Sequence, residues 1–249
     1  MCKKACRLAP RSGPRDLCLF VVMRHRWKPA VAPRDCRRRH RHRGRSPLGA
    51  SSQSKLDVRE PDPPPVADVA ARLAERLEDI GCDYALGGAI ALACWAEPRG
   101  TVDADVSFYL PIKEPGKTIA VLHAINAEFS ESKVRESLAE HGFCRAQFLG
   151  RRLDVFLPIA TIYEAARPRR KRMPIGDRQV MIWDAETLCV FKMMFFRRKD
   201  LADVEAILRS QGENLDLSWV VGQLIDMYGN RDPRVSQWNE LVGETRAES

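Results

Sequence analysis

The amino-acid sequence predicts an α+β fold, in which a mixed β-sheet with flanking helices is followed by a helical C-terminal part. Between residues 84 and 183, short apolar segments with the alternation of strands stand between segments with helical spacing, an order typical of a mixed sheet domain. From residue 185 onward, apolar residues recur every three or four positions, as they do along the buried face of a helix.

The elements of the sheet domain are predicted from apolar periodicity and from the glycines that interrupt it. Helices are expected over residues 66–80, 89–95, 117–128, 132–141 and 161–167. Strands are expected over residues 84–86, 102–110, 143–149, 152–157 and 179–183, and the third and fourth should pair as a hairpin around Gly150. Four apolar segments after residue 185 predict the helices of the C-terminal part.

Composition divides the chain into three regions. Residues 1–65 are rich in Arg and Pro, and residues 1–50 alone hold 15 Lys and Arg against 2 acidic residues. Such a segment has little apolar surface to bury, so we expect a basic, disordered tail that ends in a stiff, proline-rich linker. The rest of the chain is mildly acidic, with the sheet domain expected over residues 66–183 and the helical part over 184–249.

The basic tail has several interpretations. Its arginine-rich run, residues 37–43, could contact nucleic acid nonspecifically through phosphates. The tail could equally be a solvated segment, or an upstream extension that arises from a wrongly chosen start codon. Its cysteines and histidines do not follow a standard zinc-site spacing.

Cysteine usage and hydropathy favour a cytoplasmic protein. Four cysteines lie inside apolar segments, at positions 82, 94, 144 and 189, which is typical of buried free thiols and not of a disulfide framework. No apolar run approaches the roughly 18 residues of a membrane span. We therefore expect a cytoplasmic location and no membrane partner.

Three aspartates on two predicted strands are the candidate catalytic residues and metal ligands. Asp103 and Asp105 point to the same face of their strand, where their charges repel each other unless a cation lies between them. Mg²⁺ suits such a place, because it binds carboxylate oxygens and keeps positions for phosphate oxygens. Asp154 interrupts an apolar strand. If the two strands are neighbours, the three carboxylates could hold two divalent ions for a phosphoryl transfer, and Asp154 could accept a proton from the attacking hydroxyl.

Two further segments could bind a triphosphate. Gly87 and Gly88 stand between a strand and a helix, where the missing side chains let phosphates approach the backbone and the helix N-terminus. Lys192 and the basic residues of segment 197–203 could neutralise the terminal phosphates. Each segment alone is a weak signal, since Gly-Gly often marks only a turn and Asp-x-Asp a solvated edge strand. The order of these segments along the chain favours a phosphoryl-transfer site.

The motifs that carry this order are Leu86-Gly87-Gly88-Ala89, Arg99-Gly100-Thr101-Val102-Asp103-Ala104-Asp105, Leu153-Asp154-Val155, and Lys192 followed by Arg198-Lys199-Asp200 and Asp203. They resemble the motifs of the polymerase-beta-type nucleotidyltransferase superfamily over roughly residues 66–212. The branch that they resemble most includes the abortive-infection toxin nucleotidyltransferases of prokaryotes. Two features depart from the pattern: many members have Gly-Ser in place of Gly87-Gly88, and the basic tail has no counterpart.

The resemblance implies an enzyme that uses two Mg²⁺ ions to move a nucleoside monophosphate from an NTP, such as ATP, to a hydroxyl acceptor. By position, Asp103 and Asp105 would bind metal, and Asp154 would bind metal and help to deprotonate the acceptor. Asp200 and Asp203 could orient the phosphate-binding cations. The implied nucleotide contacts are Gly87, Gly88, Arg99, Thr101, Lys192 and Arg198.

The acceptor stays open between RNA, a protein hydroxyl and a small molecule. From the resemblance alone, the protein could be the toxin of a toxin–antitoxin pair, with an antitoxin as its partner. One alternative is a non-catalytic nucleotide-sensing or interaction module on the same fold, although a structural protein has no use for three carboxylates. Another is a nucleic-acid-binding protein that acts through its tail.

Overall fold

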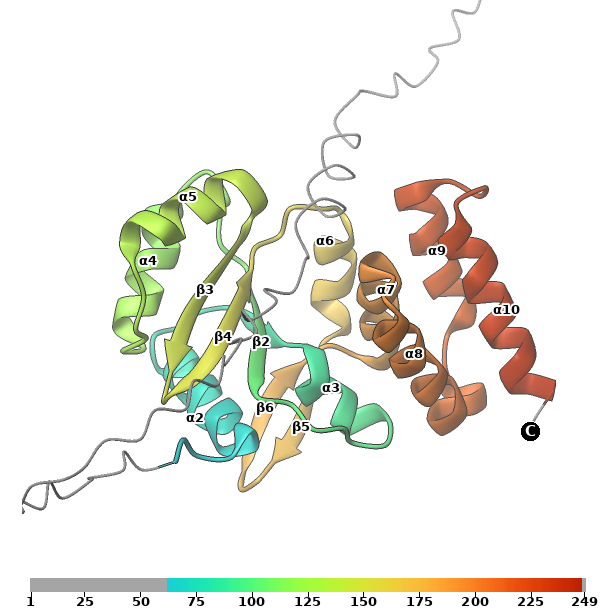
Figure 1. Ribbon diagram of the computed structural model, residues 1–249, viewed down its shortest axis with the longest axis horizontal. Helices are drawn as coiled ribbons and strands as arrows, with labels where there is room; N and C mark the ends of the chain where they lie inside the picture. The colour runs from blue at the N-terminus through green and yellow to red at the C-terminus, as the bar shows by residue number, and fades with distance from the viewer. Residues whose placement is uncertain (1–61, 248–249) are drawn as a thin grey trace, which may run out of the picture. The chain divides into compact units, whose positions relative to one another are not determined.

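A six-stranded mixed β-sheet lies at the centre of residues 62–247, the part of the chain that the computed structural model describes (Figure 1). The expectations for residues 1–61 fall outside this part. The sheet and the helices around it confirm the predicted α+β class. The strands are β1 (Tyr84–Leu86), β2 (Asp103–Phe108), β3 (Phe143–Phe148), β4 (Arg151–Phe156), β5 (Lys171–Ile175) and β6 (Arg178–Ile182), arranged in the order β3-β4-β2-β1-β6-β5.

The helices lie close to the positions that apolar spacing predicts. α2 (Val66–Asp79) packs against β2, β5 and β6, and the chain leaves it through Gly81, which has a φ of 66°. α3 (Gly88–Trp95) packs against β2, and α5 (Glu131–His141) against β3. The remaining helices are α4 (Pro115–Ala124), α6 (Ile162–Ala166), α7 (Ala185–Phe195), α8 (Arg198–Gln211), α9 (Leu217–Tyr228) and α10 (Pro233–Ala247), with short 3₁₀ turns at Arg167–Arg169 and Gly212–Asn214.

The centre of the sheet joins strands that are far apart in sequence. β2 pairs in parallel with β4 and antiparallel with β1, and β1 continues in parallel with β6. Side chains alternate along these strands, so one face carries the apolar core. The core residues of β2 and β4 on that face are all buried: Ala104, Val106, Phe108, Leu153 and Val155.

The predicted hairpin is present, and a neighbouring strand was missed. β3 and β4 are antiparallel and join through Leu149 and Gly150, whose φ values of 52° and 74° suit a two-residue hairpin turn. β5 was not predicted, because its sequence begins with two basic residues and contains Pro174. The strand lies at the edge of the sheet, where a proline and charged side chains are tolerated.

The elements that follow Asp184 are all helical, as expected, and Asp184 itself ties the first of them to the turn after α6. Its carboxylate accepts a hydrogen bond from the Thr187 backbone N–H (3.0 Å) and thereby caps α7. The same carboxylate accepts a hydrogen bond from Nε of Arg169 (2.7 Å), which follows α6. Among residues 62–247, no helix is both long enough and apolar enough to cross a bilayer.

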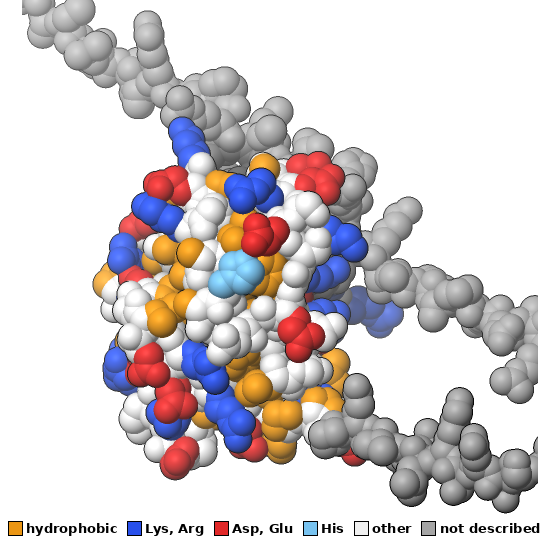
Figure 2. All heavy atoms as spheres, turned by 90° about the vertical axis from the view of Figure 1, so that its left-hand side faces the viewer, with side chains coloured by type: hydrophobic (Ala, Val, Ile, Leu, Met, Phe, Trp, Pro, Cys, Tyr) orange, Lys and Arg blue, Asp and Glu red, His pale blue; other side chains and the backbone are white. Residues whose placement is uncertain are grey.

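The surface formed over β3, α4 and α5 carries both signs of charge. Figure 2 shows basic and acidic side chains interspersed on this face, with apolar side chains between them. An interspersed surface of this kind does not concentrate the positive potential that favours nonspecific contact with nucleic acid.

Candidate functional site

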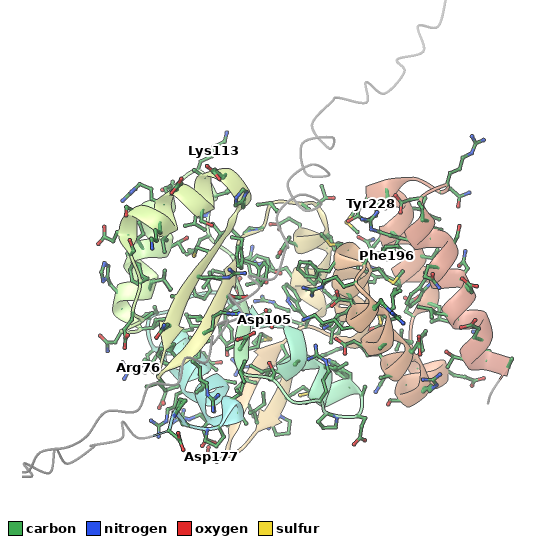
Figure 3. The ribbon with its side chains drawn as sticks, viewed as in Figure 1. Arg76, Asp105, Lys113, Asp177, Phe196 and Tyr228 are labelled. Atoms are coloured by element: carbon green, nitrogen blue, oxygen red, sulfur yellow. The ribbon has the colours of Figure 1, made fainter. Side chains whose placement is uncertain are left out.

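The structure brings the three predicted aspartates together on one face of the sheet. β2 and β4 are adjacent and parallel, and their register places Asp105 directly beside Asp154 and Asp103 beside Arg152. Directly paired residues of neighbouring strands point to the same face, so the three carboxylates share it. Figure 3 shows Asp105 near the middle of the sheet, at the start of α3. The condition that the sequence left open, that the two strands are neighbours, is met.

Burial and mutual repulsion set the electrostatics of these carboxylates. Asp154 has a side chain that is 1% exposed. Burial raises its pKa to about 6, the charges of Asp105 and Asp103 act in the same direction, and Arg152 and Arg145 oppose them. Burial also raises the pKa of Asp105, against the pull of Lys192. The protein therefore bears an electrostatic cost to hold three acids here, and a bound cation would relieve it.

Two arginines that sequence reasoning missed lie among the carboxylates. Arg152 donates a hydrogen bond to Oδ2 of Asp103, and its Nε lies 3.3 Å from Oδ1 of Asp154. Arg145, on β3, has its Nε 3.4 Å from the same Oδ1. Alternation along β4 could have identified Arg152, which precedes Asp154 by two residues and so shares its face. Only the pairing of β3 with β4 reveals Arg145.

The Gly-Gly turn is built around Asp105. The backbone N–H of Gly87 donates to the carbonyl oxygen of Asp105 (2.9 Å), which ties the turn to β2. Gly88 has a φ of 56°, and a Cβ at this position would lie 1.8 Å from Oδ2 of Asp105. A Cβ on Gly87 would lie 3.2 Å from Cδ1 of the buried Trp183. Both glycines thus have a packing reason in this fold, in addition to the phosphate contact expected of them.

The segment before β2 is anchored at both of its predicted nucleotide contacts. Arg99 makes a bidentate ion pair with Asp203 of α8, with Nε at 2.7 Å and the terminal nitrogen at 3.0 Å from the two carboxylate oxygens. Thr101 accepts a hydrogen bond through Oγ1 from the backbone N–H of Asp103 (3.3 Å). The Arg99 pair holds the entry to β2 against α8, and the Thr101 contact fixes the turn just before the strand.

The predicted phosphate-binding cations lie in different surroundings. Lys192 is buried on α7, with its Nζ 2.5 Å from Oδ2 of Asp203. Asp200 accepts hydrogen bonds from the Arg197 side chain, whereas Arg198 is exposed at the first position of α8. Lys192 therefore lies between the two aspartates of α8, close to Asp203 and 3.9 Å from Oδ1 of Asp200, and Asp200 also pairs with Arg197, the residue before α8.

Lys199 adds a further positive charge to this region. Its pKa is lowered by burial and by the positive charges of Arg197, Arg99 and Lys192, and its own charge lowers the pKa of Asp105. Cations from three segments therefore act on one another and on the carboxylates. Such a cluster favours a multiply charged anion.

The donor set fits a hard divalent cation. Three carboxylates supply only oxygen atoms, which Mg²⁺ prefers. Oδ1 of Asp154 is buried and has no hydrogen-bond partner in the described part of the chain, although two guanidinium groups lie beside it. Within residues 62–247, no three His, Cys, Asp or Glu side chains are already arranged around a metal position. The guanidinium of Arg152 contacts two of the three carboxylates instead.

Comparison with known proteins finds similarity at the level of fold. No protein-family model and no curated protein sequence matches the chain. The antibiotic-resistance factor ANT(2'')-Ia in complex with adenylyl-2''-tobramycin is 13% identical, with 74% of this chain and 98% of that chain covered and a TM-score of 0.43. A nucleotidyltransferase-like protein from Paracoccidioides brasiliensis is 15% identical, with coverage of 69% and 92% and a TM-score of 0.38. A tRNA-processing enzyme is 11% identical, with coverage of 70% and 58% and a TM-score of 0.25. These likenesses concern the fold, and they assign neither activity nor substrate to this chain.

Proposed function

We propose that this chain is a Mg²⁺-dependent nucleotidyltransferase, which moves a nucleoside monophosphate from an NTP to a hydroxyl acceptor. The observation that carries the proposal is the register of β2 with β4, which sets Asp105 beside Asp154 with Asp103 on the same face. Three acids placed together, one of them fully buried, are costly in a structural protein and useful in one that binds cations.

Asp103, Asp105 and Asp154 would hold the metal. Bound there, Mg²⁺ would act as a Lewis acid that stabilises the charge on the reacting phosphate oxygens. The protein's own contribution begins with Asp154, which lies directly beside Asp105 in the register of β2 with β4. From this position its carboxylate could accept the proton of an acceptor hydroxyl.

The cation cluster of α7 and α8 would meet the triphosphate. The exposed side chains of Arg198 and Lys199 are the candidates for direct contact with phosphate oxygens. Lys192 is buried against Asp203, so its proposed role is to hold α7 to α8 and to contribute positive potential at Asp105. Gly87 is buried and Gly88 half-buried at the start of α3, and the absence of a side chain on Gly88 would leave room for a phosphate at this helix N-terminus.

The proposal can be tested by transfer of label from α-labelled NTPs in the presence of Mg²⁺, with RNA, protein and small-molecule fractions of a cell lysate as acceptors. Transfer should occur with the wild type and fall by at least about 100-fold in Asp105→Asn and Asp154→Asn, since positioning of the reacting groups is lost. Asp177→Asn is the matched control, because Asp177 is an exposed acid in the turn between β5 and β6, far from Asp105 (Figure 3).

The fraction that becomes labelled identifies the acceptor class. Equal transfer by the wild type and both site variants would refute the proposed site. Transfer that is lost in the site variants and retained in Asp177→Asn would support it.

A further inference from the structure

Arg152 is the cation of the site that contacts two of the three carboxylates. Its guanidinium donates to Oδ2 of Asp103 and lies 3.3 Å from Oδ1 of Asp154. The position follows from the register, because Arg152 pairs with Asp103 and precedes Asp154 by two residues on the same strand. The Arg152 side chain is 44% exposed, whereas that of Asp154 is 1% exposed. The guanidinium therefore contacts a buried acid although the Arg152 side chain as a whole is partly exposed.

The oxygens that Arg152 contacts are the ones that a divalent cation would need. Oδ1 of Asp154 is buried and lacks a hydrogen bond among the described residues, so the nearby guanidinium compensates its charge without fully satisfying it. A dication bound to Asp103 and Asp154 would replace Arg152 at these oxygens and would repel the guanidinium at short range. Arg152 and the metal thus exclude each other from the same carboxylates.

A displaced Arg152 would remain beside the site. Its backbone is fixed in β4 between β2 and β3, so only the side chain can move. Two positive groups side by side repel each other unless an anion lies between them. The guanidinium of an arginine can donate two hydrogen bonds to the oxygens of a phosphate group, so a phosphate suits this position. The anion that the proposed function supplies is the triphosphate.

We propose that Arg152 is a displaceable counter-ion: it occupies the carboxylates in the metal-free protein, competes with the divalent cation, and passes to the nucleotide phosphates when the metal binds. This inference rests on the proposed nucleotide-binding function. It makes metal binding weak when no nucleotide is present and couples the two ligands, so that each raises the affinity of the site for the other.

The test measures binding of Mn²⁺ alone, as a spectroscopic substitute for Mg²⁺, to full-length protein by titration calorimetry and electron paramagnetic resonance. Arg152→Gln should bind Mn²⁺ at least about 5-fold more tightly than the wild type, because the competitor is gone. Arg152→Lys keeps the positive charge, but its single ammonium group cannot bridge two carboxylates as a guanidinium does. Its Mn²⁺ affinity should therefore lie between those of the wild type and Arg152→Gln.

Arg151→Gln is the matched control. Arg151 is the adjacent residue of β4 and carries the same charge, but it points away from the site and donates to the carbonyl oxygens of Pro63 and Pro64 (3.0 Å each). Its Mn²⁺ affinity should equal that of the wild type. Circular dichroism and thermal unfolding establish that each variant is folded before the titrations are compared.

Coupling provides the second measurement. A non-hydrolysable NTP analogue should raise the Mn²⁺ affinity of the wild type by a larger factor than that of Arg152→Gln. Mn²⁺ affinity in Arg152→Gln that is equal to or weaker than the wild-type value, or no binding at all, would overturn the inference. The two proposals can fail separately. If Arg152→Gln binds Mn²⁺ more tightly but the wild type transfers no nucleotide, only the proposed enzymatic function is refuted. If the wild type transfers nucleotide but Arg152→Gln has the Mn²⁺ affinity of the wild type, only the counter-ion proposal is refuted.

Discussion

The Cα of Gly88 lies against the carboxylate of Asp105, so closely that a Cβ would stand 1.8 Å from Oδ2 and 2.6 Å from Cγ. The contact joins the first residue of α3 to the middle of β2 and fixes the direction of the carboxylate. The positive φ of 56° at Gly88 adds a second reason for glycine, because an L side chain is strained there.

Gly88→Ala should therefore both destabilise the protein and move Asp105. The left-handed backbone costs an alanine about 1 kcal/mol or more, and the clash adds to this. Urea denaturation should show the loss of stability, and nucleotide transfer should fall with it. Gly222→Ala in α9 is the control, since its Cβ would meet open space and alanine favours a helix.

The clash can be separated from the backbone strain by a double-mutant cycle. In an Asp105→Ala background the two nearest atoms are absent and the next, the Cβ of residue 105, is 3.0 Å away. The cost of Gly88→Ala should be smaller there. Equal costs in the two backgrounds would show that the carboxylate is not what excludes a side chain.

The buried ion pair of Lys192 with Asp203 should contribute far more to the free energy of unfolding than an exposed ion pair does. Both side chains are less than a tenth exposed, and Asp203 also receives the bidentate contact of Arg99. Asp203→Ala removes the nearest carboxylate of the buried Lys192 and leaves only Asp200, at 3.9 Å, so its cost in urea unfolding should approach the value of about 3–5 kcal/mol for a broken buried pair. Adding Lys192→Met to Asp203→Ala should recover part of that stability.

Glu114→Ala provides the comparison, because the Glu114–Lys117 pair is more than half exposed on both sides. Its removal should cost less than about 1 kcal/mol. Similar costs for Asp203→Ala and Glu114→Ala would contradict the buried-pair interpretation.

The candidate site was predictable where its residues are local in sequence. Alternation alone places Asp103 and Asp105 on one face, and apolar neighbours on both sides single out Asp154. The juxtaposition of Asp105 with Asp154 depends on the parallel pairing of β2 with β4, which about 50 residues of intervening chain separate. The order of strands in a sheet depends on tertiary packing. From the sequence, the meeting of the three carboxylates could therefore be predicted only on the condition that the two strands are neighbours.

The cations show the limits of the sequence more clearly. Lys192 was predicted as a phosphate contact, yet the packing of α7 on α8 buries it against Asp203. Periodicity assigns residues to faces, but it does not say which cation has an acid within reach on the next helix. Strand β5 was missed for a related reason, because its basic residues and Pro174 are compatible with a strand only at a sheet edge.

Removal of residues 1–61 should leave nucleotide transfer intact, because every residue of the proposed site lies between Gly87 and Asp203. The same deletion removes the most basic part of the chain, so salt-sensitive binding to nucleic acid should weaken. Filter binding at two salt concentrations, alongside the transfer assay, measures both effects. If the deletion abolished nucleotide transfer and left nucleic-acid binding unchanged, residues 1–61 would be needed for catalysis and the rest of the chain would bind nucleic acid.

The pH dependence of stability should carry the signature of Asp154. Its pKa rises from the ordinary 3.8 to about 6 on folding, so between these values the folded protein binds more protons than the unfolded chain. The contribution of Asp154 to the stability of the metal-free protein should accordingly be greatest at the acid end of this window and fall as the pH rises through it. The raised pKa of Asp105 acts with the same sign.

Asp154→Asn removes this contribution, so the difference in unfolding free energy between the wild type and the variant should change by up to about 3 kcal/mol between pH 4 and pH 7. The control, Asp177→Asn, should keep the wild-type slope. Addition of Mg²⁺ should stabilise the wild type more at pH 7.5 than at pH 5, because the metal requires the carboxylates in their ionised form. A slope that is the same in Asp154→Asn and in the wild type would mean that the buried acid is already fully compensated by Arg152 and Arg145, leaving no cost for a cation to relieve.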